Sequence, residues 1–209
     1  MKRNAISLIF CSFALLALCG CSSNENINNG GGNEGGGNEG GGSEEENSKV
    51  LVAYFSASGN TKEAAELISS SLNGDLFEIE PKEEYTSADL NYSDDSSRVV
   101  REHEDPSLRD IELVTNTPAN WDTYSKVFIG YPIWWGIAAW PINNFVKLND
   151  FNGKDVIPFC TSSSSGIGES GTLLHELNDS GNWLEGRRFS SSPNESDVNE
   201  WLKTLNLID

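Results

Sequence analysis

Short apolar runs alternate with longer amphipathic segments from residue 50 to residue 207. Nearly continuous apolar runs predict strands that are buried on both faces of a sheet. These runs cover residues 50–55, 76–79, 126–130, 156–160 and, more weakly, 183–189. The segments between and after them predict helices, several with apolar residues recurring every three or four positions. They cover residues 61–72, 88–104, 138–148, 168–177 and 196–207.

Strands separated by helices predict a parallel sheet whose two faces are both covered. Right-handed crossovers then give a doubly wound, three-layer α/β sandwich. We therefore expect residues 49–209 to form one domain around a five-stranded parallel sheet. A segment of this length can bury a full core.

Three segments rich in glycine or hydroxyl side chains each follow a predicted strand. They cover residues 56–61, 130–136 and 161–168. In open parallel sheets, ligands bind beyond the carboxyl ends of the strands, where the strand order reverses. All three segments should project from that edge, which predicts a ligand site there.

The first loop, 56–61, has the composition of a phosphate-binding turn at a helix N-terminus. Backbone N–H groups point outward there, the helix dipole is positive and short hydroxyls add donors. The alternative is an ordinary strand–turn–helix with a Ser/Thr cap. Nothing in this loop resembles the Gly-x-x-x-x-Gly-Lys-Ser/Thr loop of nucleotide triphosphatases. The predicted binding residues are Ser56, Ala57, Ser58, Gly59, Asn60 and Thr61.

The second loop places two adjacent tryptophans directly after a buried strand. A flat ring needs an apolar wall and backbone donors at its edge, and this loop offers both. We expect Trp134 to face the ligand and Trp135 to point inward; the reverse, or both rings in the core, are the alternatives. The predicted binding residues are Pro132, Ile133, Trp134, Trp135 and Gly136.

The third loop is a serine run that can offer small side chains and main-chain groups. Within it, residues 166–171 match Gly-x-Gly-x-x-Gly, but a dinucleotide fingerprint belongs in the first strand–helix turn, so we set this match aside. The predicted binding residues are Thr161, Ser162, Ser163, Ser164, Ser165 and Gly166.

The N-terminus resembles a bacterial lipoprotein signal. Lys2 and Arg3 precede an apolar stretch, 6–18, that is too short to span a membrane as a mature helix. We expect cleavage after residue 20 and lipidation of Cys21 with several acyl chains, palmitate included, which together give stable anchoring. An uncleaved anchor or a plain secretory peptide is the alternative.

Residues 21–48 show no apolar periodicity and repeat Gly-Gly-Gly-Asn-Glu from Gly30 and Gly35. Such a segment cannot bury a core, so we expect a flexible acidic tether that gives the domain reach from a membrane. The protein is then exported and lipid-anchored on the periplasmic or cell-surface side, and the lipid is its only membrane contact.

The net charge of the domain indicates which partners it can bind, and its cysteine and histidines indicate whether it holds a metal. Setting aside residues 1–48 leaves 12 basic and 26 acidic side chains, a net charge of −14. This disfavours nucleic acid and favours a basic protein partner, unless the charge serves solubility alone. Cys160 ends an apolar run and is interpreted as a core residue. Neither His103 nor His175 belongs to a ligand cluster, so we predict no metal.

Taken together, residues 49–209 resemble the flavodoxin superfamily, in particular the flavodoxin-like domains of bacterial lipoproteins and small flavin reductases. The resemblance rests on loop 56–61 and the runs 127–136 and 153–161. It implies the sheet order 2-1-3-4-5 and one FMN per domain: its phosphate on the first loop, its ring on the second and the pyrimidine end of the ring on the third. Serines 56 and 58 replace threonines of the flavodoxin pattern Thr-x-Thr-Gly-x-Thr, and serines 162–165 replace a segment that is often richer in glycine.

The resemblance implies an electron-transfer flavoprotein in which the flavin carries the reaction, so we expect no catalytic acid or base. Our first hypothesis is a membrane-tethered electron carrier that serves a redox protein with a basic surface. The alternatives are an FMN-dependent NAD(P)H:quinone or small-acceptor reductase, and a binding module that has lost the cofactor.

Overall fold

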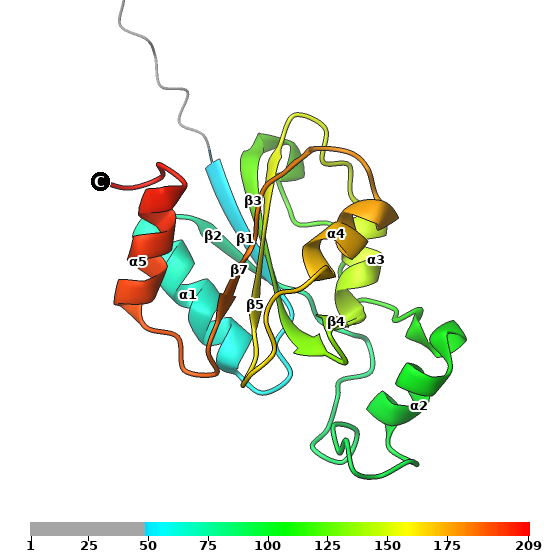
Figure 1. Ribbon diagram of the computed structural model, residues 1–209. Coiled ribbons are helices and arrows are strands. Elements are labelled where there is room, and N and C mark those ends of the chain that lie inside the picture. The colour runs from blue at the N-terminus through cyan, green and yellow to red at the C-terminus, as the bar shows by residue number, and fades with distance from the viewer. Residues whose placement is uncertain (1–48) are drawn as a thin grey trace, which may run out of the picture. The chain divides into compact units, whose positions relative to one another are not determined.

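The computed structural model describes residues 49–209 (Figure 1). The predicted signal peptide 1–20, the lipidation site Cys21 and the tether 21–48 lie outside the described residues and stay predictions. Within residues 49–209, no helix combines the length and the apolar character needed to span a membrane.

A mostly parallel sheet forms the centre of the domain, with the path β2-β1-β3-β5-β6. β7 also pairs with β5, and β4 forms an antiparallel hairpin with the end of β3. The chain runs outward in both directions from β1 and β3, so the strand order reverses between them. The strands are β1 (Lys49–Tyr54), β2 (Asp75–Glu78), β3 (Tyr124–Trp134), β4 (Ile137–Ala138), β5 (Asp155–Thr161), β6 (Asn182–Trp183) and β7 (Arg187–Phe189).

Helices cover both faces of the sheet. In Figure 1, α1 and α5 lie on one side, α3 and α4 lie on the other, and α2 lies beyond the carboxyl ends of the strands. This confirms the predicted doubly wound α/β sandwich. The helices are α1 (Asn60–Leu72), α2 (Arg98–Glu104), α3 (Pro141–Leu148), α4 (Ser170–Leu177) and α5 (Glu195–Thr204), with 3-10 turns η1 (Pro106–Arg109) and η2 (Trp121–Thr123).

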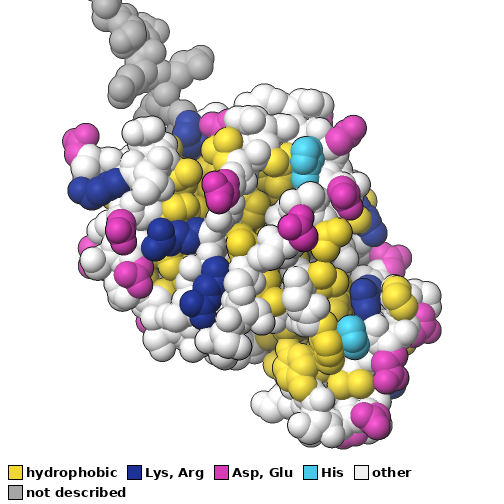
Figure 2. All heavy atoms as spheres, viewed as in Figure 1, with side chains coloured by type: hydrophobic (Ala, Val, Ile, Leu, Met, Phe, Trp, Pro, Cys, Tyr) yellow, Lys and Arg dark blue, Asp and Glu magenta, His cyan; other side chains and the backbone are white. Residues whose placement is uncertain are grey.

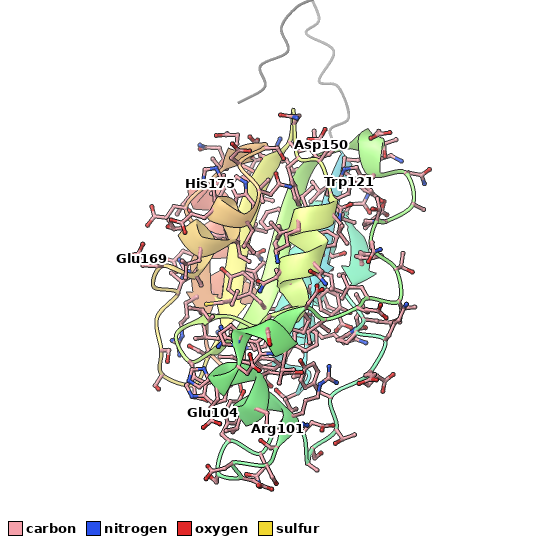
Figure 3. The ribbon with its side chains drawn as sticks, turned by 90° about the vertical axis from the view of Figure 1, so that its right-hand side faces the viewer. Arg101, Glu104, Trp121, Asp150, Glu169 and His175 are labelled. Atoms are coloured by element: carbon pink, nitrogen blue, oxygen red, sulfur yellow. The ribbon has the colours of Figure 1, made fainter. Side chains whose placement is uncertain are left out.

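Side chains of the central strands alternate between two hydrophobic cores. Along β1, Leu51 and Ala53 pack toward α3, whereas Val52 and Tyr54 pack toward α1 and α5. Each face therefore has its own apolar layer, which explains why the strands read as continuous apolar runs. Figure 3 looks onto the face that α3 and α4 cover, with Arg101 of α2 at the carboxyl edge of the sheet and Trp121 at the opposite edge.

The fifth strand differs from the prediction. Residues 183–189 were expected to form one strand, but β6 and β7 are two short strands that pair with opposite ends of β5. Between them, a Cβ on Gly186 would lie 2.6 Å from the carbonyl oxygen of Pro158. The chain therefore passes very close to the middle of β5, and only glycine fits there.

Four helices are shorter than predicted: α4 begins at Ser170 and α5 ends at Thr204, and two others begin later than expected. The expected helix 88–104 begins only at Arg98, because side chains of Asp89, Asn91 and Asp94 accept hydrogen bonds from nearby backbone N–H groups and hold local turns instead. The expected helix 138–148 begins at Pro141, a favourable first helical position. Ala138 belongs to β4, so the second loop is a hairpin and not a loop-to-helix connection.

Candidate functional site

A cavity of about 460 Å³ lies at the carboxyl edge of the sheet, where the three predicted loops meet. This volume is within the usual range for cofactor sites. The cavity is lined by Ala57, Ser58, Asn60, Leu90, Tyr92, Pro132, Ile133, Trp134, Thr161, Ser162, Ser163, Ser164, Ser165 and Ser191. The structure thus brings together segments that are far apart in sequence, as the strand pattern predicted.

The first loop is held by one hydroxyl. Ser56 Oγ accepts hydrogen bonds from the backbone N–H of Gly59 at 3.1 Å and of Lys62 at 3.2 Å. Gly59, at the N-cap of α1, has a left-handed φ of 92°. This conformation favours glycine and turns the chain sharply from β1 into the helix.

The turn leaves several backbone donors without a protein acceptor at the helix N-terminus. Within the described residues, no protein acceptor takes a hydrogen bond from the backbone N–H of Ser58, Asn60 or Thr61. The dipole of the 13-residue helix α1 adds partial positive charge at the same point. Free N–H groups around a left-handed glycine form a concave donor set for an anion such as a phosphate.

Two threonines tie the first loop to the third. Thr61 Oγ1 lies 2.8 Å from Thr161 Oγ1, and both residues are buried. The hydroxyl of Thr61 was expected to be a ligand donor; it instead forms this internal hydrogen bond. Thr61 does not line the cavity, whereas Thr161 does.

The second loop is a tight hairpin whose turn residues, Trp135 and Gly136, have φ values of 46° and 83°. Two consecutive positive φ angles are typical of a two-residue hairpin turn, although tryptophan is an unusual residue to adopt one. The turn sends the two indoles in different directions. The ring of Trp134 is 2 % exposed and packs edge-on against Phe55 and Trp140.

Trp135 presents much more of its indole to solvent, with 39 % of the residue exposed. Its ring stacks on His103 of α2, with centroids 4.1 Å apart and an interplanar angle of 7°. Tyr92 lies against the same indole at 4.9 Å. Trp134, which was expected to face the ligand, thus lines the cavity, whereas Trp135, which was expected to point inward, lies partly exposed against α2. Figure 2 shows hydrophobic side chains gathered next to a histidine on this part of the surface.

A buried carboxylate holds α2 beside the hairpin. Glu102 is 4 % exposed and accepts hydrogen bonds from Tyr85 Oη and Trp140 Nε1, both at 2.6 Å, and from Arg98 Nε at 2.7 Å. Burial and this carboxylate raise the pKa of Tyr85 far above its usual value. The hydroxyl of Tyr85 is thereby kept protonated as a donor to Glu102.

The third loop folds back on itself and is fixed by a cation. Ser162 Oγ donates to the carbonyl oxygen of Ser165. From β7, Arg188 donates through Nε to Ser162 Oγ at 3.1 Å and through Nη2 to the carbonyl oxygens of Ser162 at 2.7 Å and Ser163 at 3.1 Å. The sequence pattern did not predict this role for Arg188.

Some predicted binding residues do not line the cavity, and three residues that line it were not predicted. Ser56, Gly59, Thr61, Trp135, Gly136 and Gly166 do not line it. The unpredicted lining residues are Leu90, Tyr92 and Ser191. Ser191 follows β7, so the rule that hydroxyl groups after a parallel strand reach the ligand edge could have found it. Leu90 and Tyr92 come from a polar stretch whose path depends on tertiary contacts.

The cavity wall is electrically neutral. None of its lining residues, all of them within the described part of the chain, carries a charged side chain. Lys62, at the start of α1, does not line it, and its Nζ lies 3.5 Å from Glu78. Uncharged hydroxyls, backbone groups and apolar walls suit a flat ligand bearing one anionic group.

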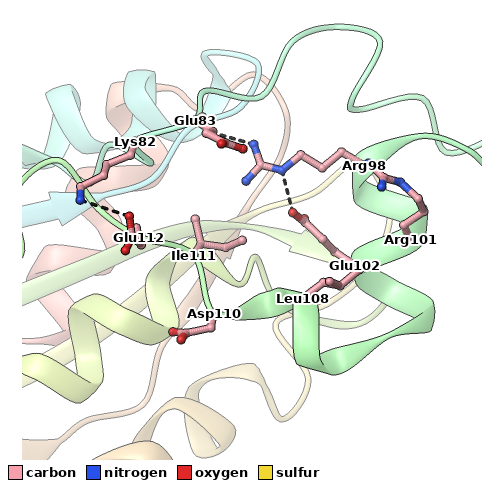
Figure 4. Close-up of a pocket in the computed structure, with 9 residues that line it drawn as sticks. All are labelled: Lys82, Glu83, Arg98, Arg101, Glu102, Leu108, Asp110, Ile111 and Glu112. Carbon is pink, nitrogen blue, oxygen red and sulfur yellow. Dashed lines mark hydrogen bonds and ion pairs between the residues drawn. The ribbon is translucent and has the colours of Figure 1, made fainter.

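A second hollow, of about 500 Å³, lies between α2, η1 and the segments 82–83 and 110–112 (Figure 4). Four of its charged side chains already form ion pairs: Lys82 pairs with Glu112, and Arg98 pairs with Glu102 and donates to the carbonyl oxygen of Glu83. None of the residues that line it is a glycine. We therefore place the candidate site at the carboxyl edge of the sheet.

Fold and site together define a doubly wound α/β protein with a cofactor-sized cavity at the switch point of its parallel sheet. The flavodoxin family model matches residues 49–205 of the chain. The chain therefore belongs to the flavodoxin family.

Solved structures of similar proteins agree with this assignment. A protein of Bacteroides eggerthii DSM 20697, described as a flavoprotein, is 43% identical over 76% of this chain and 98% of its own, with a TM-score of 0.69. A protein of Bacteroides uniformis ATCC 8492, described in the same way, is 38% identical over 75% and 98%, with a TM-score of 0.68.

A third structure is that of a flavoprotein from Lactobacillus acidophilus NCFM in complex with FMN. It is 26% identical over 74% of this chain and 98% of its own, with a TM-score of 0.54. A search of curated proteins found no match.

Proposed function

We propose that this chain binds one FMN in the cavity at the carboxyl edge of its sheet. The observation that carries the proposal is the donor set at the start of α1. The N–H groups of Ser58, Asn60 and Thr61 have no protein acceptor within the described residues, and they surround a glycine with φ 92°. This donor set fits a phosphate without a metal or a cationic side chain. Membership of the flavodoxin family and the FMN complex of the Lactobacillus relative support the same cofactor.

The remaining cavity walls would hold the isoalloxazine ring. Pro132 and Ile133 offer an apolar edge, and Tyr92 and Trp134 offer aromatic surface. The serine loop, Ser162–Ser165, would meet the pyrimidine end with hydroxyl and main-chain groups. In this arrangement the protein binds and orients the ring, while the bound FMN supplies one- and two-electron redox chemistry.

We propose further that the protein is an electron carrier, tethered to a membrane through Cys21 and exchanging electrons with a basic redox protein. Support comes from the net charge of −14 on residues 49–209, from the lipoprotein-like N-terminus and from the neutral cavity, which offers no charged group as a proton donor.

The carrier role is tested with the full-length chain purified in detergent and loaded with FMN. An electron carrier should exchange electrons rapidly with a basic redox protein and turn over NAD(P)H with quinones slowly. Fast steady-state turnover of NAD(P)H with a quinone would favour the reductase alternative. A chain that binds no FMN would overturn both.

A further inference from the structure

Arg188 is the cation attached to the cavity wall. Its guanidinium donates three hydrogen bonds to Ser162 and Ser163, both of which line the cavity. Two of the three acceptors are backbone carbonyl oxygens, so the fork of the guanidinium fixes the path of the main chain as well as one hydroxyl.

The sheet register explains how Arg188 reaches this loop. Arg188 of β7 lies opposite Cys160 of β5, one residue before β5 ends at Thr161. The loop itself returns to β7, because the backbone N–H of Ser162 donates to the carbonyl oxygen of Phe189 at 3.2 Å. The half-buried guanidinium therefore sits directly behind the segment that forms this wall.

The charge of Arg188 has no carboxylate partner within the described residues, since none of the four ion pairs found there includes it. Its hydrogen-bond acceptors are neutral, so the full positive charge remains beside the cavity. A half-buried, unpaired charge acts over a longer range than an exposed ion pair.

A neighbouring thiol shows the direction of this influence. Burial raises the pKa of Cys160 to about 12, and the charge of Arg188 acts in the opposite sense, toward the anion. A negative charge formed on the other side of the serine loop would be stabilised in the same way.

Building on the proposed function, we propose that Arg188 is a positioning residue that holds the serine loop against the cofactor and makes its reduced form bind more tightly. When FMN takes up two electrons and one proton, it becomes FMNH⁻, with its negative charge at the pyrimidine end of the ring. That end is the one we assign to the serine loop. A cation behind the loop therefore favours FMNH⁻ over neutral oxidised flavin and raises the redox potential of the bound cofactor.

The test compares Arg188→Gln with Arg187→Gln in the full-length chain. Arg187 is a matched control: it is the neighbouring residue of β7, it is also half-buried, and its substitution removes the same charge. Its guanidinium lies over the ring of Phe189, and no hydrogen bond joins it to the serine loop. Affinities for oxidised FMN and for dithionite-reduced FMN are measured anaerobically, together with the midpoint potential of the bound flavin.

Arg188→Gln should weaken binding of reduced FMN about tenfold more than binding of oxidised FMN, which lowers the two-electron midpoint potential by about 30 mV. Arg187→Gln should leave this ratio close to that of the natural chain. Arg188→Lys, which keeps the charge but loses the fork, should bind both forms more weakly and recover most of the potential.

Equal potentials in Arg188→Gln and Arg187→Gln would overturn the proposal. An equal loss of affinity for both redox forms would also overturn it, because loop positioning alone moves both affinities together. If Arg188→Gln does not fold, Arg188→Lys tests the proposal instead. A midpoint potential about 30 mV below that of the natural chain in Arg188→Lys would contradict a role for the charge. Failure of the natural chain to bind FMN is a different result and would refute the proposed function itself.

Discussion

At the residue scale, a few unusual backbone and side-chain environments determine the site. Gly59 is the clearest example, because its φ of 92° creates the donor turn while a Cβ at this position would contact nothing within 4 Å. The cost of any other residue here is therefore conformational and not steric.

Gly59→Ala should lower the free energy of unfolding by about 1 kcal/mol and raise the Kd for FMN several-fold, because the left-handed turn becomes unfavourable. Gly153→Ala is the matched control: its φ is 75°, its Cβ also meets nothing, and it precedes β5 at the opposite edge of the sheet. It should cost similar stability and leave the Kd for FMN unchanged. Urea denaturation and FMN titration measure both; equal FMN affinity in the two variants would contradict the assigned role of the turn.

Cys160 should be chemically inert in the folded protein. Burial raises its pKa to about 12, compared with about 8.5 for a free thiol. Alkylation at pH 8 followed by peptide mapping should leave Cys160 unmodified until denaturant is added.

The same shift has a consequence for stability. The neutral, buried thiol contributes fully to the free energy of unfolding below about pH 8.5. This contribution is lost as the pH rises toward 12, because the thiol ionises first in the unfolded chain. Cys160→Ala should reduce this alkaline loss of stability. Rapid alkylation of the native protein would contradict the burial of the thiol.

At the element scale, the central strands and most helices follow from the sequence, and the exceptions share a cause. Continuous apolar runs predicted β1, β3 and β5, because both faces of each strand are buried. The split of 183–189 into β6 and β7 depends on contacts with β5 that no local pattern records. The position of α2 likewise depends on long-range contacts, the hydrogen bonds that Glu102 accepts from Tyr85 and Trp140.

Glu102→Ala should therefore lower the free energy of unfolding by about 3 kcal/mol, because it leaves the donors of Tyr85, Trp140 and Arg98 without their acceptor. Glu104→Ala, two residues along the same helix at an exposed position, should change it by about 0.5 kcal/mol or less. Thermal and urea unfolding distinguish the two variants. Similar stabilities would show that this carboxylate does not hold α2 in place.

At the site, the sequence predicted the edge of the sheet and all three loops, but not which side chains contact the ligand and which hold the loops in place. A run of hydroxyl side chains does not predict that Thr61 forms a hydrogen bond with Thr161, or that Arg188 holds the serine loop in place. The direction of Trp135 was not predicted either, because it depends on the positive φ of the hairpin turn. Such contacts join residues far apart in sequence and appear only once the sheet is assembled.

At the scale of the whole molecule, charge should govern encounters with partners. Residues 49–209 carry a net charge of −14. Electron exchange of the FMN-loaded protein with a basic redox protein should slow about tenfold as the ionic strength rises from about 0.01 M to about 0.3 M. Exchange with an acidic redox protein of similar potential should instead be slow at low salt and become faster. Stopped-flow kinetics measure both, and salt-independent rates would contradict electrostatic steering.

One FMN should bind where the three loops meet. Equilibrium titration of the flavin-free, full-length chain with FMN, followed by the loss of flavin fluorescence, tests it most directly. We predict saturable binding of one FMN per chain, with riboflavin, which lacks the phosphate, bound at least tenfold more weakly because it cannot use the donors at the start of α1. Absence of saturable binding would contradict an FMN site in this chain, and equal affinity for FMN and riboflavin would contradict phosphate binding at the start of α1.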